Sequence, residues 1–131
     1  MDRPVLALTW AEFDEAVDHL AGALSGAGVE RVYGVPRGGL CLAVALSHRL
    51  RVPLIDHPAP GALVVDDIYD TGQTMEALRG YGRTLAVWAV KGSPAGVIAA
   101  RACHSDQWLV FPWEDPSNAQ TEQEVFRDSR Q

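Results

Sequence analysis

The chain has 131 residues, 47% of them hydrophobic, a length that fits one domain over residues 1–131 and leaves no room for a second independent core. Its formal net charge of -6 at pH 7 argues against broad binding of nucleic acid, because Lys and Arg must neutralise the phosphates there. No apolar run approaches the ~20 residues of a membrane-spanning helix, and the N-terminus does not resemble a signal peptide, so we expect a cytoplasmic protein without membrane contacts.

Taken in chain order, the hydrophobic pattern begins with an amphipathic helix. Thr9 and Glu12 form a capping-box pattern at its start, and apolar residues recur every three or four positions until Gly26 or Gly28. Short apolar runs and longer apolar stretches then alternate along the chain. They predict strands over 30–35, 52–56, 62–67, 84–90, 96–103 and 108–112, and helices over 40–50 and 75–82.

Strands that alternate with helices over this length indicate an α/β fold, a doubly wound parallel sheet with flanking helices. Ligands of such sheets bind outside the carboxyl ends of the strands, at the point where the strand order switches. Two polar loops, residues 36–39 and 66–74, follow predicted strands and are therefore expected at that edge.

Residues 62–74 read ALVVDDIYDTGQT, an apolar strand that ends in two adjacent acids and leads into a polar turn. The backbone N–H groups of that turn can point together at an anion, and the N-terminus of the following helix adds partial positive charge. Gly72 permits a close approach that a side chain would block. We therefore predict a cup for a monophosphate, formed by Thr71, Gly72, Gln73 and Thr74.

Carboxylates beside a phosphate cup repel the phosphate but accept hydrogen bonds from sugar hydroxyls, and a vicinal diol offers two donors. Asp66 and Asp67 are therefore predicted to hold a ribose and to face magnesium through water. Three other interpretations stay open at this point. An adjacent acidic pair also ends a strand in phospho-acceptor domains, and surface acids can cap a helix. The triplet DTG is also that of aspartic proteases, whose chemistry needs two such carboxylates.

The stretch VVDDIYDTGQT resembles the phosphoribosyl-pyrophosphate motif of the type I phosphoribosyltransferases, in which hydrophobic residues precede two acids and a D-T-G-x-T loop. The family also carries a short pyrophosphate-binding loop, often with an unusual peptide conformation, and VYGVPRGGL at residues 32–40 is similar to it. Two glycines there free the backbone to turn N–H groups toward a diphosphate, although an R-G-G triplet alone also fits an ordinary turn. The resemblance implies diphosphate binding by Pro36, Arg37, Gly38 and Gly39.

The resemblance is closest to bacterial xanthine-guanine phosphoribosyltransferases and extends to the base-binding residues. Lys91 is similar to the lysine that these enzymes direct at the 6-oxo group of a purine, and Trp108 to the aromatic side chain that stacks on the base. Leu109 would offer backbone groups to the ring edge, and Asp70 would exchange the proton on purine N7. A packing role for Trp108 and a solvated surface position for Lys91 remain alternative interpretations.

By this resemblance the protein binds phosphoribosyl pyrophosphate and a nucleobase or nucleoside monophosphate, with Mg²⁺ as cofactor. It would transfer the 5-phosphoribosyl group to a 6-oxopurine such as guanine, xanthine or hypoxanthine. A pyrimidine or orotate-type substrate is the alternative, and the likeness at Lys91 and Trp108 speaks against it. The resemblance further implies a core over roughly residues 28–92, a C-terminal hood and tail over roughly 93–131, and a homodimer or homotetramer.

One interval departs from the family pattern. Family members usually have a long mobile loop before the acidic motif, which closes over the reacting groups, whereas only HPAPG, residues 57–61, fills that place here. Two prolines in so short a link cannot form a lid. Three interpretations follow: a transferase shielded by a partner subunit or by its own tail, a slow enzyme, or a non-catalytic nucleotide-binding or regulatory module that retains the fold.

Overall fold

The computed structural model describes residues 4–81, 85–104 and 106–115. Secondary-structure elements alternate along these residues as the sequence predicts. They are β1 (Val5–Ala7), α1 (Trp10–Leu24), β2 (Val32–Gly34), α2 (Leu40–Leu50), β3 (Leu54–Ile55), β4 (Leu63–Tyr69), α3 (Gln73–Ala77), β5 (Leu85–Val90), β6 (Val97–Ala102) and β7 (Trp108–Val110).

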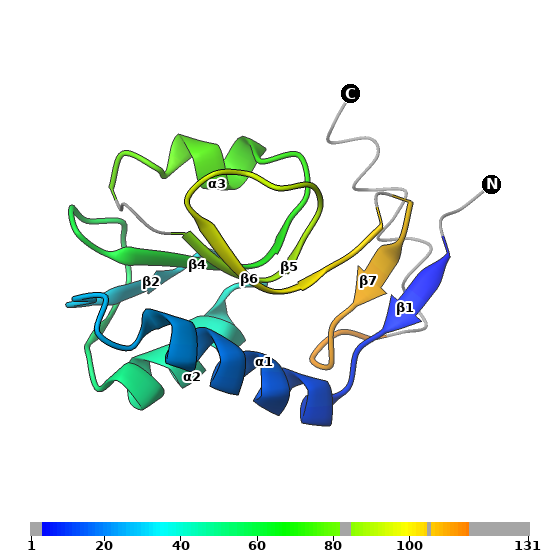
Figure 1. Ribbon diagram of the computed structural model, residues 1–131, viewed down its shortest axis with the longest axis horizontal. Coiled ribbons are helices and arrows are strands. Elements are labelled where there is room, and N and C mark those ends of the chain that lie inside the picture. The colour runs from blue at the N-terminus through cyan, green and yellow to red at the C-terminus, as the bar shows by residue number, and fades with distance from the viewer. Residues whose placement is uncertain (1–3, 82–84, 105, 116–131) are drawn as a thin grey trace.

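A five-stranded parallel sheet in the order β3-β2-β4-β5-β6 forms the centre of the molecule. Helices α1 and α2 cover one face of this sheet and α3 lies over the other (Figure 1). The structure thus confirms the predicted doubly wound α/β fold. The chain moves outward from β2 to β3 and then returns to the other side of β2 to form β4, so the strand order switches between β2 and β4. Ligands of open α/β sheets bind at such a switch point.

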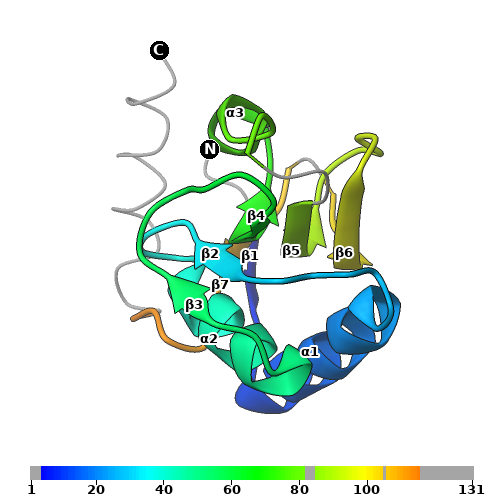
Figure 2. The same cartoon turned by 90° about the vertical axis from the view of Figure 1, so that its left-hand side faces the viewer.

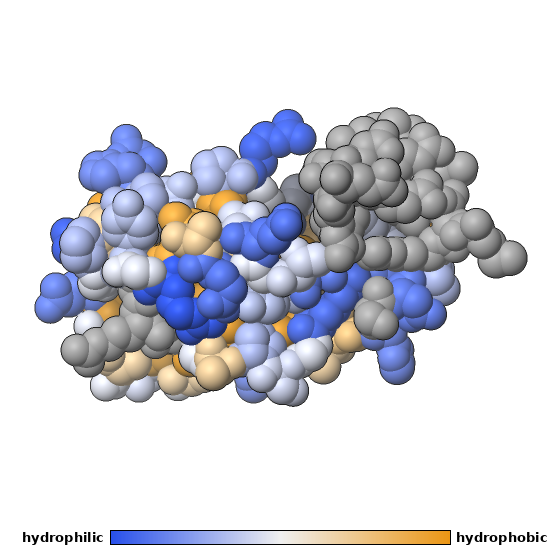
Figure 3. All heavy atoms as spheres, turned by 90° about the horizontal axis from the view of Figure 1, so that it is seen from above, coloured by the Kyte–Doolittle hydropathy of each residue, from blue (hydrophilic) through white to orange (hydrophobic). Residues whose placement is uncertain are grey.

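The larger hydrophobic core lies between the sheet and the two helices α1 and α2. Leu20, Leu42 and Leu46 are fully buried there against the strands. The smaller core, under α3, contains Met75 and Val87. Figure 3 looks onto the α3 face, where hydrophilic side chains are interspersed with hydrophobic ones.

A second, two-stranded sheet stands beside the main one. Strands β1 and β7 pair in parallel, with Val5 opposite Trp108 and Ala7 opposite Val110 (Figures 1 and 2). The sequence pattern predicts β7 but not β1, because three residues are too few to show a period. The predicted hood residues of β7 thus pair with the N-terminal strand, while residues 116–131 of the predicted hood and tail lie outside the described residues.

Stacked and edge-on aromatic rings join this second sheet to α1. Trp88, from the centre of β5, contacts Phe13 of α1 and Phe111 at ring-centroid distances of 5.5 and 5.4 Å. Trp113 stacks on Phe111 at 5.3 Å. Trp88 and Trp113 are thus packing residues, and aromatic contacts hold the two-stranded sheet against α1 and β5.

The sequence pattern predicts the start of α1 and the bounds of α2 correctly, but it predicts the end of α3 wrongly. The backbone N–H of Glu12 donates to the Thr9 hydroxyl at 3.1 Å, which confirms the capping box of α1. Helix α2 has the predicted bounds. Helix α3 ends at Ala77 instead of residue 82, because the chain turns at residues 78–81, where Gly80 disfavours a helix. No helix among the described residues is long and apolar enough to cross a membrane.

Candidate functional site

Asp66 and Asp67 lie in the second half of β4, after the three fully buried residues that begin the strand. The backbone N–H of Asp67 donates to Asp66 Oδ1 at 2.8 Å, which fixes the orientation of the Asp66 carboxyl group. Burial, and next the charge of Asp67, raises the pKa of Asp66 to about 9. Burial also raises the pKa of Asp67. The pair therefore retains a proton at neutral pH when nothing positive is bound beside it.

The glycine loop that follows β2 lies directly against this acidic pair. A Cβ atom added to Gly38 would overlap the Asp67 carboxylate, and one added to Gly39 would overlap the carbonyl oxygen of Val65. The N–H of Val35 donates to that same carbonyl oxygen at 2.9 Å. Close approach of backbone atoms thus requires glycine at position 39, a side chain at position 38 would displace the Asp67 carboxylate, and the two loops predicted to share a ligand are adjacent in space.

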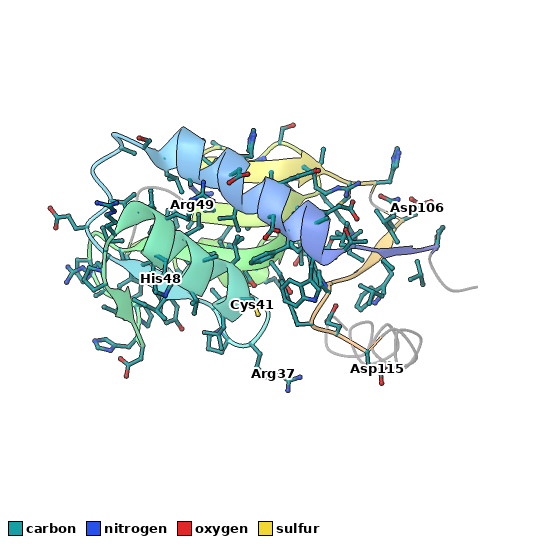
Figure 4. The ribbon with its side chains drawn as sticks, turned by 90° about the horizontal axis from the view of Figure 1, so that it is seen from below. Arg37, Cys41, His48, Arg49, Asp106 and Asp115 are labelled. Atoms are coloured by element: carbon teal, nitrogen blue, oxygen red, sulfur yellow. The ribbon has the colours of Figure 1, made fainter. Side chains whose placement is uncertain are left out.

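The other two residues of this loop, Pro36 and Arg37, are exposed. The peptide bond between them is cis. Figure 4 shows the Arg37 side chain projecting from the loop that precedes α2, away from the body of the protein. Its guanidinium is therefore accessible to an anion from solvent.

The predicted phosphate cup forms the turn between β4 and α3. Gly72 is buried and has a φ of 85°, a left-handed conformation that favours glycine. Thr71, Gln73 and Thr74 are exposed, and the Gln73 N–H makes only a long contact of 3.4 Å to the Thr71 hydroxyl. Helix α3 has five residues, so its peptide dipoles add less than expected from the sequence. A phosphate bound at this turn would depend mainly on the amides and hydroxyls of the turn itself.

Asp70 and Lys91 meet at the carboxyl ends of the neighbouring strands β4 and β5. Lys91 Nζ lies 3.4 Å from Asp70 Oδ2 and donates to the main-chain oxygen of Gln107 at 3.3 Å. The Lys91 side chain is only 7% exposed, so a solvated surface position for it is wrong. Burial of an ammonium group requires polar partners, and here they come from two different parts of the chain.

The base-binding segment predicted around Trp108 forms β7, with one edge on β1. The N–H of Trp108 donates to Pro4 O at 2.8 Å, and Val110 O accepts from the Leu8 N–H at 2.8 Å. In a parallel ladder alternate residues face the same neighbour, so the backbone groups of Leu109 point away from β1. They lie on the edge that also carries the Gln107 oxygen bound to Lys91.

Gln107 is a site residue that sequence reasoning missed. Its main-chain oxygen, not its side chain, holds Lys91, and a main-chain oxygen leaves no trace in the amino-acid sequence. The other predicted residues form two connected groups. Loop 36–39 lies against the pair at 66–67, and Asp70 joins Lys91 and the start of β7.

A doubly wound parallel sheet with an acidic strand end, a phosphate-type turn and a glycine loop at its switch point defines the phosphoribosyltransferase class of α/β folds. No family model matches the chain. The purine phosphoribosyltransferase from Pyrococcus horikoshii is similar in structure, with a TM-score of 0.68 and 31% sequence identity over 88% of this chain and 96% of that one. The protein therefore belongs to the type I phosphoribosyltransferase family.

Two further comparisons extend this result. The chain is 28% identical over 139 residues to the xanthine-guanine phosphoribosyltransferase of Idiomarina loihiensis, with 82% of this chain and 85% of the relative covered. It also shares its fold with a hypothetical protein from Neisseria gonorrhoeae with bound ppGpp, at a TM-score of 0.67 and 20% identity over 97% of this chain and 99% of that one.

Proposed function

We propose that the protein transfers the 5-phosphoribosyl group of phosphoribosyl pyrophosphate to a 6-oxopurine and releases pyrophosphate. The observation that carries this substrate assignment is the pair Asp70–Lys91, whose carboxylate and ammonium groups lie 3.4 Å apart beside the edge of β7 that faces away from β1. A 6-oxopurine presents O6 and N7 side by side on one edge. Lys91 donates to O6 while Asp70 accepts the proton from N7, whereas adenine would turn an amino group toward the ammonium.

The backbone of β7 supports the same assignment. Leu109 directs its N–H and C=O away from β1, where they can read the opposite edge of a base that contacts Lys91. Trp108, half-buried at the start of the strand, would supply a flat surface for stacking. These contacts recognise a planar base and orient it for attack.

The reaction breaks the bond between ribose C1 and the diphosphate oxygen, and the electron pair leaves with the diphosphate. A base nitrogen forms the new bond to C1, and the N7 proton passes to the Asp70 carboxylate. Arg37 and the Gly38 and Gly39 amides stabilise the charge that develops on the departing diphosphate. The turn at residues 71–74 anchors the 5′-phosphate, so that C1 stays oriented toward the base.

The acidic pair fits a divalent cation. Carboxylate oxygens are ligands that Mg²⁺ prefers, and a cation beside Asp66 and Asp67 would relieve the repulsion that helps raise the pKa of Asp66 to about 9. When bound, Mg²⁺ would neutralise charge on the diphosphate. The same carboxylates, once ionised, accept hydrogen bonds from the ribose hydroxyls.

An assay of pyrophosphate release tests this proposal. The protein is incubated with phosphoribosyl pyrophosphate and Mg²⁺, together with guanine, hypoxanthine, xanthine, adenine or orotate in separate reactions. We expect release with the 6-oxopurines and formation of the matching nucleoside monophosphate. Release with adenine or orotate in preference to the 6-oxopurines would contradict the assignment of Lys91.

A second candidate function is nucleotide binding without turnover. Only residues 56–62 connect β3 to β4, so this connection is too short to cover the site. The similar fold of the Neisseria gonorrhoeae protein with bound ppGpp points to guanine nucleotides as ligands. Calorimetric titration with ppGpp and with GMP separates the two functions: tight binding together with no pyrophosphate release for any base would favour the binding module.

A further inference from the structure

Tyr69, the last residue of β4, lies directly beneath the turn that we propose as the phosphate cup. It is 9% exposed, and a Cβ atom added to Gly72 would overlap its hydroxyl oxygen. The Tyr69 hydroxyl therefore packs directly against Gly72, the residue of the turn with the left-handed backbone conformation. Neither the predicted site nor the proposed mechanism uses this side chain.

The tyrosine hydroxyl is itself held by an ion pair. It donates to Glu76 Oε2 at 2.6 Å. Arg79 donates two hydrogen bonds to the same carboxylate, from Nε to Oε1 at 2.7 Å and from Nη2 to Oε2 at 2.5 Å. The backbone N–H of Glu76 donates to Gly72 O at 2.8 Å. Glu76 therefore contacts both Tyr69 of the strand, through its carboxylate, and Gly72 of the turn, through its backbone.

The charges of this cluster matter because Glu76 lies only two residues beyond Thr74, the last residue of the turn. An unpaired carboxylate there would repel a bound phosphate. Hydrogen bonds from Arg79, and then from Tyr69, lower the pKa of Glu76 to about 2, so the carboxylate stays ionised and paired.

We propose that Tyr69, Glu76 and Arg79 are positioning residues that hold the turn at residues 71–74 in the shape that binds a 5′-phosphate, and that Arg79 neutralises the Glu76 charge beside it. This inference rests on the proposed function, because it concerns the phosphate end of the same ligand. It adds a basis for discriminating a nucleoside monophosphate from the corresponding nucleoside. The contact between Tyr69 and Gly72 explains how a strand residue shapes a loop that it does not belong to.

Calorimetric titrations with GMP and with guanosine test the inference. Tyr69→Phe keeps the ring under Gly72 and removes only the hydroxyl that holds Glu76. We expect the ratio of GMP to guanosine affinity to fall about tenfold while guanosine affinity stays unchanged, since a hydrogen bond to a charged group contributes about that much. Tyr81→Phe is the matched control, because Tyr81 is exposed at the other end of the loop that follows α3. It should leave the ratio unchanged.

Arg79→Met provides an independent variant should Tyr69→Phe fail to fold. It removes the cation that pairs with Glu76, so the affinity ratio should again fall, and 0.5 M salt should restore part of it by screening the freed carboxylate. An affinity ratio equal to that of the unaltered protein in the variant that folds would overturn the positioning role. Equal affinity of the unaltered protein for GMP and guanosine would instead overturn the proposed phosphate cup, and the inference with it.

Discussion

Asp70 and Lys91 are separated by twenty-one positions in the chain, and each needs the other to be accommodated in the structure. Lys91 is almost fully buried and lies between the Asp70 carboxylate and the Gln107 oxygen. Loss of either partner leaves the other charge uncompensated in a mostly buried position. Variants at these two residues must therefore be shown to fold before their kinetics are compared with those of the unaltered protein.

Asp70→Asn keeps the size of the side chain and its ability to accept a hydrogen bond from Lys91, but it cannot accept a proton. We expect kcat to fall at least 100-fold, about the lower end of what a general base contributes, while the KM for phosphoribosyl pyrophosphate changes less than about threefold. Steady-state kinetics with guanine measures both. An equal loss of kcat and of phosphoribosyl pyrophosphate binding would remove Asp70 from the base role.

Lys91→Met keeps the aliphatic stem and removes the ammonium group. Because a charge-assisted hydrogen bond to O6 would be lost, kcat/KM for guanine, hypoxanthine and xanthine should fall by about 10–100-fold. Competition assays with adenine as the second base show whether selectivity for 6-oxopurines has been lost. A uniform loss for every base would make Lys91 a packing residue, not a specificity residue.

Asp66 makes the stability of the unliganded protein depend on pH. Its pKa is about 9 in the folded protein, well above that of an unfolded aspartate, so the folded state binds the extra proton between about pH 4 and pH 9. The free energy of unfolding should therefore decrease as the pH rises through this interval. The carboxyl group lowers stability at neutral pH, which is consistent with a residue retained for a ligand.

Asp66→Asn resembles the protonated acid and cannot titrate. We expect its free energy of unfolding at pH 8.5 to exceed that of the unaltered protein by about 1–3 kcal/mol. Between pH 5.5 and pH 8.5 its free energy of unfolding should decrease much less than that of the unaltered protein. Urea unfolding at the two pH values measures both quantities. Asp14→Asn, an exposed change on α1, is the control and should preserve the decrease with pH. The same slope in both variants would mean that Asp66 is ionised in the folded protein.

At the scale of elements, the site depends on how closely the loop after β2 approaches β4. Gly39 has no room for a Cβ, since Val65 O and Asp66 Cα occupy that space. These are backbone atoms of a central strand and cannot move aside as the end of a flexible side chain could. The loop and the strand are therefore fitted to each other, and a change in one displaces the other.

Gly39→Ala should lower the free energy of unfolding by about 1–3 kcal/mol and abolish detectable nucleotide binding, because the loop must move off the acidic pair. Gly22→Ala is a matched control in the interior of α1, where an added Cβ meets nothing within 4 Å. It should raise stability by about 0.8–1.0 kcal/mol, the difference in helix propensity. Thermal unfolding and calorimetry compare the two. Normal nucleotide binding by Gly39→Ala would show that the close approach is dispensable.

At the scale of the whole molecule, the strand order brings the sites together. The switch between β2 and β4 places the glycine loop beside the acidic pair, and the aromatic contacts of Trp88 and Phe111 hold β7 where Lys91 can reach it. A ligand that contacts both loops and β7 connects segments distant in the chain. Binding of such a ligand should therefore stabilise the whole fold, not only one loop.

GMP with Mg²⁺ should raise the free energy of unfolding by about 2.7 kcal/mol when the free nucleotide is at 100 times its Kd. Guanosine at the same concentration should have a smaller effect, because it lacks the phosphate that the turn at residues 71–74 is proposed to hold. Differential scanning calorimetry measures the shift in Tm for each ligand. No shift with GMP or with phosphoribosyl pyrophosphate would argue against a nucleotide site at this edge.

Much of the fold and part of the site could be predicted from the sequence because the signals are local. The helix cap at Thr9, the bounds of α2 and the apolar strands are properties of neighbouring residues. The acids and the D-T-G-x-T turn follow one another within nine residues, so their chemistry can be recognised from that short stretch alone. The early end of α3 is missed because helix propensity near Gly80 is only a weak signal.

By itself, the sequence determined that this protein is a parallel α/β domain with a polar glycine turn after an acidic strand, because backbone conformation and side-chain chemistry over a few residues are set locally. Only the tertiary structure decided that β1 pairs with β7, that Gln107 holds Lys91 beside Asp70, and that Tyr69 supports Gly72. These contacts depend on strand order and on close packing between distant segments. They arise from burying a shared core, which no short stretch of sequence encodes.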